Sequence, residues 1–290
     1  MAFDLSLVGK PSEPSTFDYT WKDASLYALG IGAKAEELDY LFEGKPPRGE
    51  ASGEGPLVYP SFAVVPAYAP MIGLLARSGG NLAMVVHGGQ KVRMHRPLPP
   101  EGSLRTTATI RGIYDIKKFA SIITDTHTVD AKTGEPLFDT TWTIIFRGEG
   151  SFGGSPPPKD EPIVIPAGAA PDFSVREPTS KEQALLYRLS GDLNPLHADP
   201  AFAAAAGFTQ GPILHGLCTY GHMVRHVVKS LCDGDARKLK GFDGQFKRPV
   251  WPGDVLVTNG WKIGDNRWAL QVAVENREGE VVIGNAQALL

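Results

Sequence analysis

The feature that most constrains the fold is an internal repeat. Arg96 corresponds to Arg248 and Pro60 to Pro212, and both pairs are 152 positions apart. A constant offset over such a distance indicates a duplicated unit. Between the copies, residues 148–171 are rich in Gly, Ser and Pro, which is typical of a linker. We therefore predict an N-terminal half (1–147), a linker (148–171) and a C-terminal half (172–290).

Each half contains one long apolar stretch followed by several β-like runs. The apolar stretches are residues 62–76 and 213–231, and the runs are 103–116, 119–130, 138–148, 255–263, 267–276 and 280–290. Thr, Val, Ile and aromatic residues that partly alternate favour antiparallel strands. Apolar residues at three- and four-residue spacing in 217–231 predict a helix on that sheet, whereas Pro66 and Pro70 predict a broken or late-starting helix in the first half. The expected class is α+β, a long helix wrapped by an antiparallel sheet, made twice.

Charge and targeting signals exclude several classes of function. The chain has 29 Lys and Arg against 32 Asp and Glu, so no overall basic field attracts nucleic acid. Neither a signal peptide nor an apolar run long enough for a membrane span is visible, and the C-terminal GNAQALL is not a peroxisomal tripeptide. Cys218 and Cys232 lie about 21 Å apart along a helix, too far for a disulfide. We expect a cytoplasmic protein without a membrane span.

The most informative segment is residues 187–216. Asp199, Pro200 and Gly207 have the positions of an N-cap, a first helical residue and a helix stop around the alanine-rich run AFAAAA. Asp192 and His197 therefore fall in the loop before this short helix.

A carboxylate and an imidazole in one ordered loop suit general acid/base chemistry on water. Asn194 precedes a proline, which forces an extended or turn geometry and lets Asp192 and His197 converge. The alternative is a loop in which both side chains only satisfy backbone groups.

The segment SGDLNPLHADPAFAAAAGF, followed by GPILHGLCTYG, resembles the signature of the MaoC-like (R)-specific enoyl-CoA hydratases, the hydratase 2 family. YALGIGA, YPSFAVVP, HRPLPPEG and FGG extend the resemblance over nearly the whole chain to the two-domain hydratase 2 unit of peroxisomal multifunctional enzymes. The resemblance implies a double hot-dog fold and reversible hydration of trans-2-enoyl-CoA to (R)-3-hydroxyacyl-CoA. It also implies a peroxisomal location if the chain is part of such an enzyme.

The resemblance assigns roles by position. Asp192 and His197 match the catalytic pair that holds water, and Asn194 matches the supporting residue. Gly216 matches the backbone N–H that stabilises the enolate oxygen, which suits the start of a helix. Tyr187 and His215 are candidate substrate-binding residues. The resemblance implies neither a metal ion nor an organic cofactor, and acyl-CoA is the expected partner of a homodimer.

The first half departs from this pattern. Aligning YAL at Tyr27 on YRL at Tyr187 places Gly32 opposite Asp192 and Glu37 opposite His197. This copy lacks the pair, so the resemblance implies one site per chain and a first half that shapes the acyl tunnel.

Three other signals are given non-catalytic interpretations. Residues 148–153 match G-x-G-x-x-G, but the prolines that follow cannot open a phosphate-binding helix. His222 and His226 have the spacing of a metal pair without a third ligand at a matching spacing, and we interpret them as solvated or hydrogen-bonded. We place Cys218 in the core.

Anionic groups of CoA require local basic residues. The candidates are Lys247 and Arg248, or the cluster Arg237, Lys238 and Lys240, and the alternative is a solvated basic face. Three competing functions stay open: a hot-dog dehydratase on another acyl thioester, a thioesterase, and an acyl-CoA binding protein without turnover.

Overall fold

The computed structural model describes residues 3–44 and 55–290 and divides into two compact units. Unit 1 comprises the described residues of Met1–Asp18, with Ala63–Arg96 and Ser103–Pro162. Unit 2 comprises the described residues of Tyr19–Phe62, with Pro97–Gly102 and Ile163–Leu290. This grouping differs from the predicted boundaries, because residues 19–44 and 55–62 pack with the C-terminal part of the chain.

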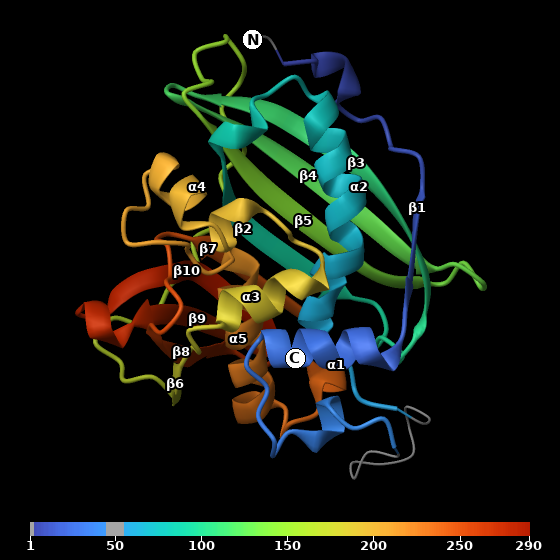
Figure 1. Cartoon of the computed structure of the whole chain (residues 1–290), viewed down its shortest axis with the longest axis vertical. Helices are drawn as coiled ribbons and strands as arrows, with labels where there is room; N and C mark the ends of the chain where they lie inside the picture. The colour runs from blue at the N-terminus through green and yellow to red at the C-terminus, as the bar shows by residue number, and fades with distance from the viewer. Residues whose placement is uncertain (1–2, 45–54) are drawn as a thin grey trace. The chain divides into compact units, whose positions relative to one another are not determined.

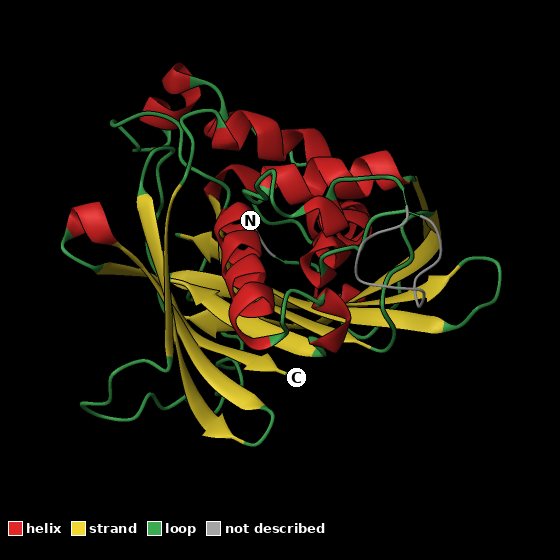
Figure 2. Cartoon of the chain, turned by 90° about the horizontal axis from the view of Figure 1, so that it is seen from below, coloured by secondary structure: helices red, strands yellow, loops and turns green. Residues whose placement is uncertain are grey.

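Unit 1 is a helix on a five-stranded sheet. Its elements are β1 (Ser15–Tyr19), α2 (Val64–Arg77), β2 (Val85–Met94), β3 (Gly102–Ile116), β4 (Phe119–Asp130) and β5 (Pro136–Arg147). The strand order is β1-β3-β4-β5-β2, and β3 to β4, β4 to β5 and β5 to β2 pair antiparallel. Helix α2 packs against β4 (Figures 1 and 2). Alternate residues of β5, including Phe138, Trp142 and Phe146, are fully buried, as expected for a strand with one face on the core.

The helix expected to be broken by proline is continuous. Helix α2 runs from Val64 to Arg77 with Pro70 inside it. Pro66 lies in the first turn, where backbone N–H groups have no partner within the helix, so its missing N–H has no cost there. The predicted break is therefore wrong.

Unit 2 repeats this design with extra helices. Its strands are β6 (Phe173–Pro178), β7 (Gly241–Phe246), β8 (Val255–Gly264), β9 (Arg267–Val274) and β10 (Glu280–Leu289). The order is β7-β10-β9-β8-β6, with antiparallel pairing throughout. Helix α5 (Gly216–Leu231) packs against β7 and β8, and α1 (Trp21–Gly30) packs against α3 (Gln183–Tyr187). The remaining α-helix is α4 (Pro200–Ala205). The 3₁₀ turns among the described residues of both units are Leu5–Leu7, Leu38–Tyr40, Pro60–Ala63, Leu82–Met84, Arg188–Ser190, Pro195–His197, Ala236–Lys238 and Glu275–Arg277.

The duplication is visible in the topology. Helices α2 and α5 begin at Val64 and Gly216, which preserves the offset of 152 positions. Each strand of unit 1 has a counterpart at the same place in the strand order of unit 2. The six predicted β-runs are all strands, and the sequence analysis missed β1, β2, β6 and β7. Among the described residues, no helix is both long and apolar enough to cross a membrane.

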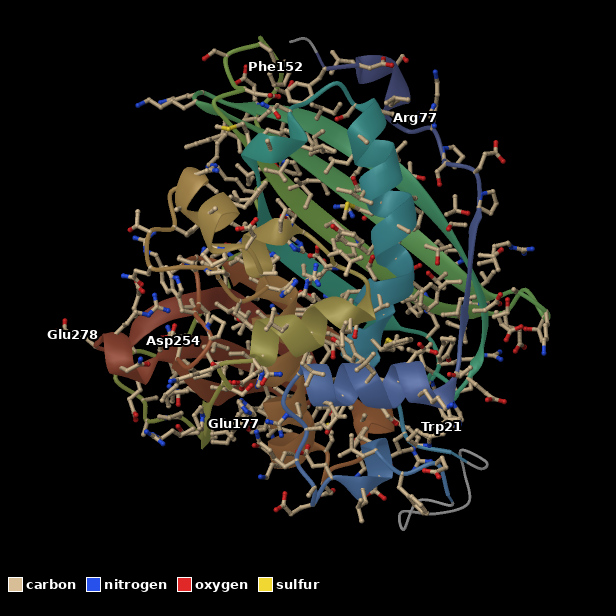
Figure 3. All side chains as sticks on the ribbon, in the orientation of Figure 1. Trp21, Arg77, Phe152, Glu177, Asp254 and Glu278 are labelled. Carbon is tan, nitrogen blue, oxygen red and sulfur yellow. The ribbon has the colours of Figure 1, made fainter. Side chains whose placement is uncertain are left out.

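A buried charge cluster joins residues 31–37 to α5 within unit 2. Arg225 is 1% exposed; its Nη1 donates to Glu37 Oε2 at 2.7 Å, its Nε donates to the Ile31 carbonyl at 3.1 Å, and its Nη2 donates to Glu177. Glu177, labelled in Figure 3, comes from β6. Although burial alone raises the pKa of Glu177, the His226 hydrogen bond and the Arg225 charge lower it overall. Arg225 therefore compensates two largely buried carboxylates.

His222 and His226 belong to this cluster and are fully buried, so they are not solvated. His226 is hydrogen-bonded through Nδ1 to Thr258 Oγ1 at 2.8 Å and through Nε2 to Glu177 Oε2 at 3.2 Å. Gly32 has a φ of +86°, and a Cβ there would lie 2.3 Å from His222 Cε1. The close approach of Gly32 to His222 therefore requires glycine.

Candidate functional site

The site is built on the segment between α3 and α5 of unit 2. Asp199 caps α4 by accepting from the N–H groups of Ala201 and Phe202 at 2.8 and 3.3 Å. Gly207 follows the helix with a φ of +95°, as its position as a helix stop predicts. Asp192 and His197 precede α4 as expected, with Asp192 half-buried and His197 8% exposed.

Asn194 shapes the turn between Asp192 and His197. Its side-chain Oδ1 accepts from the Leu196 N–H at 3.0 Å and caps the short 3₁₀ turn Pro195–His197. Its own N–H donates to Asp192 Oδ1 at 3.2 Å. Asn194 thus supports the orientation of both proposed catalytic residues.

The tautomer of His197 follows from its backbone contact. Its Nδ1 lies 2.8 Å from the Ile213 carbonyl oxygen, which can only accept, so Nδ1 carries the proton. Nε2 then holds the lone pair and is available as a base. Burial lowers the pKa of His197, while the Ile213 carbonyl and the Asp192 charge oppose that shift. His197 is consequently neutral at neutral pH.

His215 links Asp192 to the start of α5. It is buried, its ring stacks on His197 with centroids 3.7 Å apart, and its Nε2 donates to the Asp192 carbonyl at 3.1 Å. Burial and the neighbouring His197 lower the pKa of His215 to about 2, so it stays neutral. Tyr187 also packs against His215, with ring centroids 4.9 Å apart, and is itself buried. These contacts hold both rings in the interior of the site, and their role in substrate binding stays a prediction.

Gly216 is the first residue of α5, and its N–H is one of those without a partner inside the helix. The positive end of the helix dipole is at the same place. A Cβ at Gly216 would lie 3.3 Å from the Phe246 ring, tighter than an ordinary contact. The sequence analysis did not identify Phe246 or the Ile213 carbonyl as part of the site, because neither has a distinctive chemical signature.

The basic candidates for phosphate binding differ in their surroundings. Lys247 and Arg248 are exposed directly after β7, where Phe246 contacts the Gly216 position. Lys247 Nζ donates to Gln245 Oε1 at 2.7 Å, and Arg248 Nε is 3.4 Å from Glu280 Oε1.

The second basic cluster is held by its own acidic neighbours. Arg237 pairs with Asp235 at 2.8 Å, and Lys238 pairs with Asp233 at 2.6 Å. Lys240 donates to the Arg237 carbonyl at 2.8 Å. Of the two sets, Lys247 and Arg248 are the better placed for an anion near Gly216.

The glycine-rich segment 148–153 is a closed loop. Asp115 accepts from the N–H groups of Ser151 and Gly153 at 2.8 and 2.9 Å, and Phe152 packs on Phe3 with ring centroids 5.4 Å apart (Figure 3). Asp115 therefore accepts the hydrogen bonds of N–H groups that a phosphate-binding loop would donate to a phosphate. Elsewhere, Cys218 and Cys232 are both free and Cys218 is buried, as expected, and Cys232 is buried as well.

The segment that contains Asp192, His197 and His215 could also bind a metal ion. Ligand atoms of Asp192, His197 and His215 all lie within 4.8 Å of one another. Because His197 Nδ1 is engaged by Ile213, only its Nε2 could bind an ion. The expectation of a cofactor-free site stays a prediction.

Comparisons with known proteins cover both halves of the chain. Residues 17–148 match the MFE-2 hydratase 2 N-terminal domain, and residues 163–282 match the MaoC like domain. A probable enoyl-CoA hydratase 2 of Dictyostelium discoideum is 34% identical and is aligned over 96% of this chain and 93% of its own length. The enoyl-CoA hydratase ChsH3 of Mycobacterium tuberculosis is 37% identical over 99% of each chain. The crystal structure of a MaoC-like dehydratase from Phytophthora capsici matches with a TM-score of 0.86 at 29% identity, covering 100% of this chain and 97% of that one.

Proposed function

We propose that this chain, which belongs to the MaoC-like hydratase 2 family and has a double hot-dog fold, hydrates trans-2-enoyl-CoA to (R)-3-hydroxyacyl-CoA. The observation that carries the proposal is the convergence of Asp192 and His197 in one loop that His215 ties to the start of α5. Addition of water to an enoyl thioester needs a base, a carboxylate and a hydrogen-bond donor for the oxygen, and His197, Asp192 and the helix N-terminus at Gly216 provide these three groups.

In the proposed reaction, His197 Nε2 takes a proton from a water molecule that Asp192 helps to orient. The water oxygen forms a bond to C3, and the π electrons shift onto the thioester oxygen as an enolate. The Gly216 N–H stabilises that oxygen. The Asp192–His197 pair then returns a proton to C2, so one molecule of water is added in total and the reverse path is dehydration.

The supporting residues act on geometry. The Asn194 N–H holds the Asp192 carboxylate, His215 holds the Asp192 backbone carbonyl, and the Ile213 carbonyl fixes the tautomer of His197. General acid/base groups typically contribute 10²–10⁴-fold to a rate, so loss of either member of the pair has a large effect.

The test is loss of enoyl absorbance with crotonyl-CoA and a long-chain trans-2-enoyl-CoA, coupled to an (R)-specific 3-hydroxyacyl-CoA dehydrogenase. We expect activity in the wild type and at least a 100-fold lower kcat in His197→Ala and Asp192→Asn. Asp199→Asn is the matched control in the same segment, because asparagine is an equally good N-cap and Asp199 is outside the site. A wild type that is silent on both substrates contradicts the proposal.

The same assay separates the alternatives. Release of free CoA would indicate a thioesterase, and activity only on carrier-bound substrates would indicate a dehydratase of that type. Ligand binding without turnover in the wild type would indicate a binding protein. The homodimer, the cytoplasmic location and phosphate binding by Lys247 and Arg248 stay predictions.

A further inference from the structure

A second cluster of metal-ligating side chains lies in unit 1. His95, His127 and Asp139 come from three neighbouring strand segments, and their side chains are 42–53% exposed. His95 Nε2 is 2.8 Å from Asp139 Oδ2, and His127 Nδ1 is 2.6 Å from Asp139 Oδ1. One carboxylate therefore lies between two imidazoles.

The backbone holds these three residues in place. His127 of β4 and Asp139 of β5 are direct cross-strand partners. His95 follows β2, and its N–H donates to the Leu137 carbonyl of β5 at 2.8 Å, which extends the ladder by one residue. Directly opposed residues place their side chains about 5 Å apart on the same face of a sheet. The cluster is thus built on paired strands rather than on a free loop.

We propose that His95, His127 and Asp139 form a binding site for a divalent transition metal ion of the Zn²⁺ class. The relevant atoms lie within 4.8 Å of one another, and two imidazoles with one carboxylate are a donor set that Zn²⁺ accepts, with water in the fourth position. In the bound form, each imidazole carries its N–H on the ring nitrogen that faces away from Asp139, and the nitrogen that faces Asp139 is the ligand.

The buried group Glu177, His222 and His226 also meets the distance requirement. There, however, the Arg225 guanidinium already donates to Glu177, so a metal ion would face a fixed positive charge. At His95, His127 and Asp139, the contacts between the three side chains are replaced by contacts to the ion. The bound ion would connect β2 and β4 across β5 and stabilise unit 1.

The test is titration of metal-free full-length protein with Zn²⁺ alone, followed by calorimetry. We expect the wild type to bind one more Zn²⁺ per chain than His127→Ala and Asp139→Asn, or to bind that ion at least 30-fold more tightly. Asp125→Asn is the matched control, because Asp125 lies two residues from His127 on the same face of β4 but pairs with Arg111. The catalytic segment is intact in every variant, so any Zn²⁺ that it binds cancels in the comparison.

Thermal unfolding gives a second readout that is independent of enzymatic activity. Zn²⁺ should raise the Tm of the wild type and of Asp125→Asn but not that of His127→Ala, because a ligand stabilises the state that binds it. His95→Ala, which alters a residue just outside the strand, serves if a strand variant fails to fold. Equal Zn²⁺ uptake and affinity in the wild type and the His95, His127 and Asp139 variants would overturn the proposal. No uptake by the wild type in the titration would overturn it as well.

Discussion

Replacing Arg225 by methionine should strongly destabilise the protein. Methionine keeps most of the side-chain volume but removes the charge and the donors to Glu37, Glu177 and the Ile31 carbonyl. Glu37 and Glu177 are only 20% and 13% exposed. Glu37 would lose its cation, and Glu177 would keep only the half-exposed Lys34, whose Nζ lies 3.2 Å from its Oε1. His226 alone would remain hydrogen-bonded to Glu177.

The expected size follows from the burial of the cluster. Breaking a buried ion pair by removing one partner costs about 3–5 kcal/mol, because the remaining charge is uncompensated. A domain pair of this size loses about 2–4 °C in Tm per kcal/mol, so the shift should be about 10 °C. Arg176→Met is the matched control, because Arg176 makes a bidentate pair with Glu275 at the surface and should cost less than about 1 kcal/mol.

The assay is urea and thermal unfolding of the wild type, Arg225→Met, Arg176→Met and the triple variant Arg225→Met/Glu37→Gln/Glu177→Gln. Neutralising both carboxylates should restore at least half of the lost stability, because the cost lies in the unpaired charges. If Arg225→Met loses less than 1 kcal/mol, or if the triple variant is no more stable than the single one, the electrostatic reasoning is wrong.

Three further predictions concern the loops and the histidines. The Gly216→Ala variant should fold normally but have an at least 10-fold lower kcat, because the added Cβ would press on Phe246 beside the proposed oxyanion position. An unchanged kcat would show that Gly216 has no role in the mechanism. Gly32→Ala should destabilise by at least about 2 kcal/mol more than Gly134→Ala, which has a similar positive φ but open space around it, as urea unfolding would show. Burial lowers the pKa of His215 and His222, so below pH 6.5 the unfolded chain takes up protons that the folded chain does not. As the pH decreases below 6.5, the free energy of unfolding should therefore fall by up to about 1.4 kcal/mol per pH unit for each histidine. Equal stability at pH 5.5 and 7.5 would contradict this.

Much of the fold follows from local pattern. The six β-runs have alternating β-branched and aromatic residues, and all six are strands. Asp199, Pro200 and Gly207 determine the ends of α4 through capping and a positive φ, which are interactions within a few residues. Asp192, Asn194 and His197 are likewise close in sequence, so one ordered loop brings them together.

The missed features depend on contacts between distant segments. The strand β7 reads GFDGQF, and its glycines and aspartate disfavour a strand by local preference, yet pairing with β10 stabilises it. Pro70 lies inside α2 although local preference predicts a break, because the apolar residues of the helix pack on the sheet. Residues 19–44 and 55–62 are grouped with the C-terminal part, and contacts between distant positions link them, such as Arg225 with Glu37, 188 positions away, and Gln183 with Gly30, 153 positions away. Pattern within one segment contains no information about such pairs.

The Arg225 cluster also explains why the two proposed catalytic side chains cannot simply be introduced at the aligned positions of the first half. Gly32 and Glu37 occupy the positions aligned with Asp192 and His197, but Gly32 has a positive φ and faces His222 at a distance that excludes a Cβ. Glu37 accepts hydrogen bonds from Arg225 and from the Tyr59 hydroxyl at 2.7 and 2.8 Å. A Gly32→Asp/Glu37→His variant would therefore lose the partner of a buried arginine and force apart a packed histidine before any second pair could form. We expect this variant to be less stable and to gain no activity when His197 is replaced by alanine, and hydration above the background of His197→Ala would refute the argument.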